Sequence, residues 1–325
     1  MRPLISVIIP VFHVERYVEE CLRSVQRQTY PHFEAILIDD GSTDGSAAIC
    51  ERFCAGDQRF RLYRFENEGL SEARNRGTRM AKGEYLTYVD ADDWIAPPYL
   101  EKLRGLCARY GCLCSGCNHY IVSGQREAPR FSIRERHEFL ALERCLENIL
   151  YHRPPDVSAC GKLYHRSMIP ALTFPKGRLF EDTATIVTRL RAAEGMAMTY
   201  EPLYFYRRNA RSISKSDYTS RSWELMDAVE EISKQILSAY PRLKRGTIRR
   251  KTHAALSIRR LLVRCGEENG AARERAKRIV RENALSVIAD RKAPPRDKAA
   301  IALLLMGNAA FDFAWIQYQK RRESL

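Results

Sequence analysis

The sequence predicts an α/β protein with a Rossmann-like, mostly parallel sheet flanked by helices, followed by an α-helical C-terminal region. Strand and helix patterns alternate over the first hundred residues, which is typical of parallel strands joined by right-handed crossovers. From about residue 217 onward the apolar spacing is helical, and Arg and Lys are frequent. With 325 residues, 45% of them hydrophobic, the chain is long enough to bury a sizeable core.

The front of the chain pairs each predicted strand with a predicted helix. The strands are expected at 4–12, where Pro10 would end the run, and at 33–40, 59–65 and 84–94. The helices are expected at 14–28, 42–54, 69–83 and 99–110. Further along, we expect a strand-like run at 112–122, a polar loop at 124–136, helices at 138–151 and 178–193, and paired extended segments at 196–208.

The net charge of +14 is unevenly distributed along the chain. Residues 1–206 carry equal numbers of basic and acidic side chains, so the whole excess lies in 207–325. This asymmetry predicts an anionic partner for the C-terminal region. We do not expect that partner to be nucleic acid, because the basic residues are spread over many helical turns with few aromatic residues between them.

The most apolar window of the C-terminal region, 299–316, contains Asn308 and Asp312 and is too interrupted to predict a membrane span. Basic residues flank it, among them the cluster 320–322. This layout predicts either an interfacial helix that contacts an anionic membrane through 299–322 or a helix that packs on the rest of the protein. The sequence leaves both interpretations open.

The ten cysteines lie mostly inside apolar runs, so we expect reduced, buried thiols rather than a disulfide framework. The opening apolar stretch is too short for a secretory signal and has no small-residue cleavage site behind it. These features indicate a cytoplasmic protein, with peripheral contact at the inner face of the cell membrane if the C-terminal window is interfacial. The oligomeric state stays open.

Acidic and apolar residues follow three of the predicted strands at the point where each strand ends. These are Pro10–Phe12, Asp39–Asp40 and Asp90–Asp93. Ligands of open α/β sheets bind outside the carboxyl ends of the strands, and the carboxyl ends of parallel strands meet at one edge. We therefore expect these residues to gather along one rim of the sheet.

The segment Asp90-Ala91-Asp92-Asp93 is the strongest candidate for a metal site. If the segment continues the strand, Asp90 and Asp92 point the same way. Three carboxylates in four residues repel one another unless a cation neutralises them, and Mg²⁺ or Mn²⁺ prefers such oxygen ligands together with phosphate oxygens. A solvated acidic turn that caps the next helix is an equally good interpretation of the spacing.

Three other segments are weaker candidates. The carboxylates of Asp39 and Asp40 could bind a nucleobase or ribose, although an Asx turn is the better explanation of this segment taken alone. Arg74 lies near the start of a predicted helix, and its guanidinium could bind a phosphate. Alternatively, it is an ordinary charged residue of a surface helix. Glu181 and Asp182 could supply a general base, or favourable charge at a helix N-terminus. The sequence contains neither a P-loop nor a dinucleotide-binding glycine pattern.

Taken together, the segments at 4–46 and 67–103 resemble glycosyltransferase family 2, which has the GT-A fold. A second block at 160–214 is similar to the acceptor half of bacterial members that build surface polysaccharides. The resemblance covers about two thirds of the chain. It implies a catalytic domain at 1–215, with a donor half at about 1–103 and an acceptor half at about 104–215, and a separate basic helical region at 216–325.

The resemblance also implies a role for each candidate residue. It implies that Pro10 and Phe12 line the nucleobase pocket, that Asp40 binds the base with Asp39 beside it, and that Arg74 approaches the base or diphosphate. It implies that Asp90 holds the ribose or sugar side, that Asp92 ligates the metal with help from Asp90, and that Asp93 reaches the donor sugar or acceptor. It implies that Asp182 is the general base, with Glu181 as its neighbour. Phe12 stands where Tyr is more common, so stacking is kept and a hydroxyl contact is lost. Ala91 replaces a frequent Ser.

The expected activity is therefore an inverting, metal-dependent transfer from a nucleotide-diphosphate sugar, most simply a UDP-sugar, with Mn²⁺ or Mg²⁺. The acceptor would be a hydroxyl of a glycan or a lipid-linked glycan. Three alternatives remain open: a degenerate sugar-nucleotide-binding protein, a nucleotidyltransferase and a basic nucleic-acid-binding protein. A nucleotidyltransferase usually has a Gly-rich phosphate loop after the first strand, and none occurs here.

Overall fold

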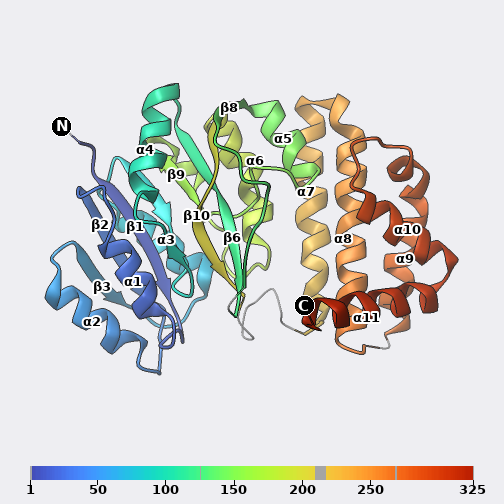
Figure 1. The fold of residues 1–325 in the computed structure, drawn as a ribbon, viewed down its shortest axis with the longest axis horizontal. Coiled ribbons are helices and arrows are strands. Elements are labelled where there is room, and N and C mark those ends of the chain that lie inside the picture. Colours follow the sequence, from blue (N-terminus) through green and yellow to red (C-terminus); the bar gives the residue numbers. More distant parts are fainter. Residues whose placement is uncertain (1, 125, 209–216, 268, 325) are drawn as a thin grey trace. The chain divides into compact units, whose positions relative to one another are not determined.

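A computed structural model describes residues 2–124, 126–208, 217–267 and 269–324 (Figure 1). The chain divides into two compact units, one comprising Met1–Ile149 and Arg153–Ala210, the other Leu150–His152 and Arg211–Leu325. The predicted domain boundary at 215–216 lies outside the described residues. The α/β class and the helical C-terminal region are confirmed.

Ten strands of the described residues form one mixed sheet in the first unit, in the order β3-β2-β1-β4-β9-β6-β10-β5, with β7 beside β6 and β8 beside β10. The strands are β1 Ile5–Val11, β2 Phe33–Asp39, β3 Phe60–Arg64, β4 Tyr85–Tyr88, β5 Trp94–Ile95, β6 Cys114–Ser123, β7 Arg126–Pro129, β8 His137–Ala141, β9 Lys162–His165 and β10 Gly195–Arg207. The helices of this unit are α1 Val18–Gln26, α2 Ser46–Gly56, α3 Leu70–Met80, α4 Tyr99–Tyr110, α5 Leu142–Leu150 and α6 Glu181–Ala192.

The first four strands pair in parallel, as the alternation of strands and helices predicts. All seven residues of β1 and of β2 are buried, which explains their continuous apolar runs. Helix α3 packs closely on β1 at Gly77, where a Cβ would come within 2.3 Å of the Ile8 side chain. Only glycine fits there, so α3 is held close to the carboxyl ends of β1 and β4.

The sequence suggested that Pro10 ends the first strand, but the structure shows that it does not. β1 continues to Val11, with Pro10 opposite Ile38 of β2. On the other side of β1 the pairing with β4 stops at Ile8. The proline therefore lies beyond that ladder, where its missing N–H removes no hydrogen bond to β4.

The predicted strand 84–94 divides into two short strands. β4 ends at Tyr88, a turn follows in which Asp93 N donates to Asp90 O (3.0 Å), and β5 pairs antiparallel with β10. The expectation that Asp90 and Asp92 point the same way along a strand is therefore wrong, because both residues lie in the turn.

Three further expectations for the first unit need correction. The stretch 124–136, expected as a loop, contains β7, which pairs with β6. The stretch 138–151 is a strand, β8, followed by α5. The paired segments expected at 196–208 are one strand, β10, with irregular register around Pro202. The ten cysteines are all free thiols, seven of them buried, so the expectation about the thiols is confirmed.

The second unit is a helical domain with its own core. Its helices are α7 Glu224–Ala239, α8 Lys244–Arg264, α9 Gly270–Ile288, α10 Pro295–Met306 and α11 Asn308–Ser324. Buried side chains include Trp223, Val229, Leu262, Ile301 and Phe311. In the part of the chain that the structure describes, no helix is both long and apolar enough to cross a membrane.

Part of the basic charge of the second unit is structural. The guanidinium of Arg249 is fully buried, and its Nε donates to Asp297 Oδ2 at 2.8 Å. Arg259, also fully buried, pairs with Asp312 of α11. Asp312, which interrupts the apolar window of the sequence, therefore has a partner inside the unit.

Candidate active site

The carboxyl ends of β1, β2 and β4 lie at the same edge of the sheet, because these strands are parallel neighbours. Phe12 follows β1 directly and is 44% exposed, and its ring stacks on His13 with centroids 4.1 Å apart. His13 has a φ of 51°, in the left-handed region, and its Nε2 lies 3.0 Å from Thr43 Oγ1. This edge thus presents an accessible aromatic ring, suitable for stacking on a flat ligand.

Asp39 and Asp40 are buried, and their carboxylates accept hydrogen bonds from backbone N–H groups. Asp39 Oδ1 accepts a hydrogen bond from Ser42 N (3.0 Å), and its Oδ2 lies 3.3 Å from Arg64 Nε. Asp40 accepts from Glu68 N (3.1 Å) and Gly69 N (2.7 Å), immediately before α3. Asp39 therefore bonds the turn that follows β2, and Asp40 fixes the start of the helix that carries Arg74.

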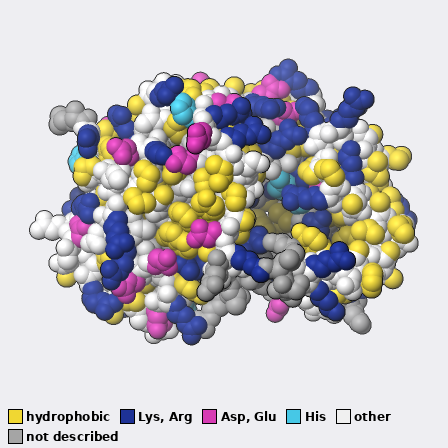
Figure 2. Space-filling view, viewed as in Figure 1, with side chains coloured by type: hydrophobic (Ala, Val, Ile, Leu, Met, Phe, Trp, Pro, Cys, Tyr) yellow, Lys and Arg dark blue, Asp and Glu magenta, His cyan; other side chains and the backbone are white. Residues whose placement is uncertain are grey.

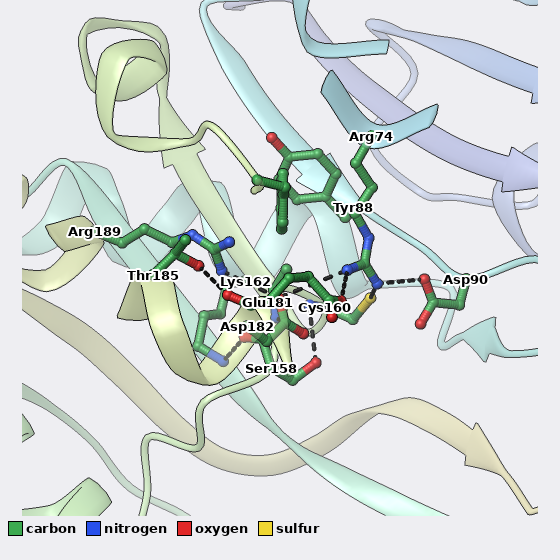
Figure 3. Close-up of polar contacts among 12 residues, drawn as sticks. Arg74, Tyr88, Asp90, Ser158, Cys160, Lys162, Glu181, Asp182, Thr185 and Arg189 are labelled. Carbon is green, nitrogen blue, oxygen red and sulfur yellow. Dashed lines mark hydrogen bonds and ion pairs between the residues drawn. The ribbon is translucent and has the colours of Figure 1, made fainter. Parts of the chain in front are cut away.

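Arg74 of α3 joins carboxylates from distant parts of the chain (Figure 3). Its side chain is only 2% exposed. Nη2 donates to Asp90 Oδ1 at 2.8 Å, Nη1 donates to Glu181 Oε1 at 2.8 Å, and Nη1 lies 3.6 Å from Asp182 Oδ1. Burial lowers the pKa of Arg74, but the three carboxylates outweigh burial and raise it well above its ordinary value.

This arrangement revises the ordinary surface-helix interpretation of Arg74. A buried guanidinium with three acidic neighbours is not a solvated helix charge. It links the turn after β4, in the predicted donor half, to the start of α6, in the predicted acceptor half. Two of the sequence-predicted acidic segments are thereby brought together.

Glu181 and Asp182 are the first two residues of α6, so the helix dipole also favours their negative charge. Burial raises the pKa of Glu181, repulsion from Asp182 raises it further, and Arg74 opposes the rise. Asp182 Oδ2 accepts a hydrogen bond from Ala159 N at 3.0 Å. The Asp182 side chain remains 20% exposed, so it can reach a bound molecule.

Arg189 is a second guanidinium beside Asp182 that sequence reasoning missed. It is 1% exposed, its Nη1 lies 3.4 Å from Asp182 Oδ1, and it covers the ring of Phe174 at 4.3 Å. Arg189 stands seven residues after Asp182, two turns further along the same face of α6, and this spacing was the available signal. Two guanidinium groups thus lie within 3.6 Å of one carboxylate oxygen of Asp182.

Lys162, also missed, orders the segment that bonds Asp182. Its Nζ donates to Asp156 Oδ1 (2.8 Å) and to Ser158 O (2.6 Å), one residue before Ala159. Lys162 is buried, and it holds the pKa of Asp156 well below its ordinary range against the effect of burial. The backbone donor to Asp182 is therefore held in place by a buried ion pair.

The acidic turn after β4 is fixed by Tyr204 of β10. The Tyr204 hydroxyl donates to Asp93 Oδ2 at 2.7 Å, and the backbone N–H of Asp90 donates to the same hydroxyl at 3.2 Å. Burial raises the pKa of Asp93 well above its ordinary value, with Asp92 and Asp90 adding to the rise. Asp93 is thus a buried structural carboxyl, whereas Asp90 and Asp92 are partly exposed.

Carboxylate oxygens are ligands that a divalent cation prefers, and the turn has two partly exposed carboxylates, those of Asp90 and Asp92. Among the described residues, no group of three or more His, Cys, Asp or Glu side chains could enclose a metal alone. Mg²⁺ and Mn²⁺ commonly take one or two carboxylates and complete their shell with waters and substrate phosphates. Asp90 and Asp92 provide two such carboxylates at the rim.

The sequence pattern described as "Glycosyl transferase family 2" matches residues 6–172. Glycosyltransferase GlyG of Streptococcus pneumoniae is 32% identical over 245 residues, which span 73% of this chain and 80% of that protein. The chain therefore belongs to glycosyltransferase family 2, and the resemblance seen in the sequence is confirmed.

Solved structures agree on the fold. Staphylococcus aureus TarS 1–349, determined with UDP-GlcNAc, has a TM-score of 0.65 at 20% identity, covering 97% of this chain and 91% of TarS 1–349. The mannosyltransferase PcManGT of Pyrobaculum calidifontis, determined with GDP-Man and Mn²⁺, has a TM-score of 0.57 at 19% identity, covering 98% of this chain and 84% of that one. Both likenesses extend over nearly the whole chain.

Proposed function

We propose that this protein transfers a sugar, with inversion, from a nucleotide-diphosphate sugar to a hydroxyl of a glycan or lipid-linked glycan in bacterial surface polysaccharide biosynthesis. One observation carries the proposal. A single guanidinium, that of Arg74, pairs with Asp90 of the acidic turn and also with Glu181 and Asp182. A transferase needs a donor-binding group and a base on the two sides of the reacting carbon, and these segments provide both.

On the donor side, we assign the nucleobase to the edge formed by Pro10, Phe12 and Asp40, with UDP as the favoured nucleotide because TarS was solved with UDP-GlcNAc. Asp90 and Asp92 would hold Mn²⁺ or Mg²⁺, which supplies positive charge beside the leaving diphosphate. Mn²⁺ accompanies GDP-Man in PcManGT. Arg74 is buried against carboxylates, so we assign it to positioning these side chains rather than to binding the base.

On the acceptor side, the Asp182 carboxylate accepts the proton of the acceptor hydroxyl. The oxygen then forms its bond to the anomeric carbon while the bond from that carbon to the diphosphate oxygen breaks, and the nucleoside diphosphate leaves with the electron pair. A single displacement inverts the configuration. Arg189 and Ala159 N–H hold Asp182 in position for this step.

The test is Asp182→Asn, measured with a radiolabelled nucleotide sugar and by calorimetric titration of the donor. We expect transfer to fall to background while donor affinity is unchanged, since the amide keeps the size of the side chain and loses the proton acceptor. Asp227→Asn, on the exposed surface of α7, is the matched control and should retain full activity. Near-native turnover by Asp182→Asn would show that another group is the base.

A degenerate binding protein is the second candidate function, and the same experiment separates it. Such a protein would bind the nucleotide sugar and release no product in the unsubstituted form. The acidic residues at 90, 92 and 182 are all present, which favours the enzyme.

A further inference from the structure

Helix α10 has one face in the core of the helical unit and another face in solvent. Ile301 and Leu304 are fully buried. Beyond the first turn, the exposed side chains are Ala299, Ala302, Leu305 and Met306, and Met306 is 77% exposed. Their spacing of three and four residues places them on one side of the helix. The solvent-facing side of α10 is therefore apolar.

Helix α11 repeats this pattern after a break at Gly307, whose φ is 141°. Phe311 is buried in the core, whereas Ala309, Phe313 and Ile316 are exposed, with Phe313 at 67%. Lys320 continues the same stripe one turn later, because 309, 313, 316 and 320 are spaced by four, three and four residues. An apolar stripe thus ends in a basic residue.

The helices of the 299–316 window therefore have one packed side and one exposed apolar side. One side of these helices packs on the unit, and its polar interruptions are partnered there: Asn308 Nδ2 donates to Glu274 Oε1 at 3.1 Å, and Asp312 pairs with Arg259. The other side keeps large apolar side chains in water. Exposing several large apolar side chains side by side to water costs free energy unless another surface covers them.

The charges around this surface indicate what covers it. Among the exposed side chains that the structure describes on α10 and α11, none is acidic. Arg296 lies in the first turn of α10, and Lys320 and Arg321 lie toward the end of α11. The structure does not describe the side chain of Arg322, which belongs to the predicted basic cluster. Figure 2 shows hydrophobic side chains gathered over the helical unit with Lys and Arg around them.

We propose that the exposed apolar stripes of α10 and α11 dock on the surface of an anionic phospholipid bilayer. The helices lie in the plane of the interface, with Leu305, Met306, Phe313 and Ile316 among the upper acyl chains and Lys320 and Arg321 at the lipid phosphates. The proposal extends the proposed function, since a lipid-linked acceptor would lie at the same surface. It does not depend on transfer, because docking needs neither donor nor acceptor.

The test is sedimentation of the full chain with vesicles of phosphatidylcholine, with and without about one third phosphatidylglycerol. The unsubstituted protein should sediment with the anionic vesicles and not with the neutral ones, and binding should weaken as salt is raised. The double substitution Met306→Ser and Phe313→Ser should raise the apparent Kd about ten-fold or more, and Lys320→Glu with Arg321→Glu should do the same.

Ile133→Ser is the matched control, since Ile133 is 49% exposed in the first unit, and it should leave vesicle binding unchanged. All variants are compared by circular dichroism to confirm that they fold. The proposal fails if the unsubstituted protein does not bind anionic vesicles or if the apolar double variant binds as well as the unsubstituted protein. A dimer that Met306→Ser and Phe313→Ser convert to a monomer, without vesicle binding, would show that the stripes join two copies of the chain.

Discussion

Replacing Arg74 with Met removes the guanidinium that holds Asp90, Glu181 and Asp182 together while keeping most of the apolar stem. The side chain is 2% exposed, and two of its hydrogen bonds measure 2.8 Å. Removing one partner of a buried ion pair costs about 3–5 kcal/mol, because the remaining charges stay desolvated. We therefore expect Arg74→Met to lower the free energy of unfolding by about this amount.

The loss should depend on pH, with a sign that follows from Glu181. Burial and Asp182 already raise the pKa of Glu181 above its ordinary 4.5, and Arg74 opposes that rise. Without Arg74 the pKa of Glu181 rises further, so above pH 4.5 the folded state binds more protons than the unfolded state. Stability of the variant then falls as pH increases through this window. The deficit relative to the unsubstituted protein should be larger at about pH 8 than at about pH 5.

The assay is urea unfolding of both proteins at these two pH values. Arg79→Met is the control: Arg79 lies on the same helix and pairs with Glu72, but it is 61% exposed and should cost less than about 1 kcal/mol. Adding Glu181→Met to Arg74→Met should restore part of the stability, since it removes one of the stranded charges. If Arg74→Met behaves like Arg79→Met at both pH values, the network does not hold the site together.

Two further predictions concern neighbouring residues. Arg189→Met should lower kcat about ten-fold with little change in the donor KM, because it loosens Asp182 and leaves the donor side intact; equal losses in kcat and affinity would contradict a positioning role. His119 of β6 is buried, and its Nδ1 lies 3.4 Å from Asp156 Oδ2. Its pKa is lowered to about 4, mainly by burial, so between pH 6.5 and 4 the unfolded state binds a proton that the folded state does not. The free energy of unfolding should therefore fall on acidification through this range, and His119→Gln should reduce that fall by about 3 kcal/mol. His32→Gln, at an exposed histidine, is the control. If His119→Gln leaves the pH dependence of unfolding unchanged, the prediction is wrong.

The sequence predicted the parallel part of the sheet well because the information there is local. β1 and β2 are buried on both faces, so their apolar runs are continuous, and helices of ordinary length separate them. The later strands were harder to predict. β5 has only two residues, and β7 exposes all four of its residues, so neither carries an apolar pattern.

The candidate site shows the same division. The acidic segments at 90–93 and 181–182 could be found because carboxylates at element ends are visible in a sequence. That Arg74 would join them could not be predicted, since the bonds from Arg74 to Glu181 span 107 positions. Tyr204 was missed for the same reason, since its bond to Asp93 spans 111 positions. Lys162 lies only six positions after Asp156, but the segment between them has no helix or strand pattern that would predict the pairing.

Thermal-shift measurements with a panel of nucleotide sugars, with and without Mn²⁺, test the central claim most directly, because a ligand that binds only the folded state raises the Tm. The unsubstituted protein and Asp182→Asn should be stabilised by the same donor, and only when Mn²⁺ is present. Asp92→Asn should lose that metal-dependent shift. A shift in Asp92→Asn equal to that of the unsubstituted protein would contradict the assignment of the acidic turn to the metal and the donor diphosphate.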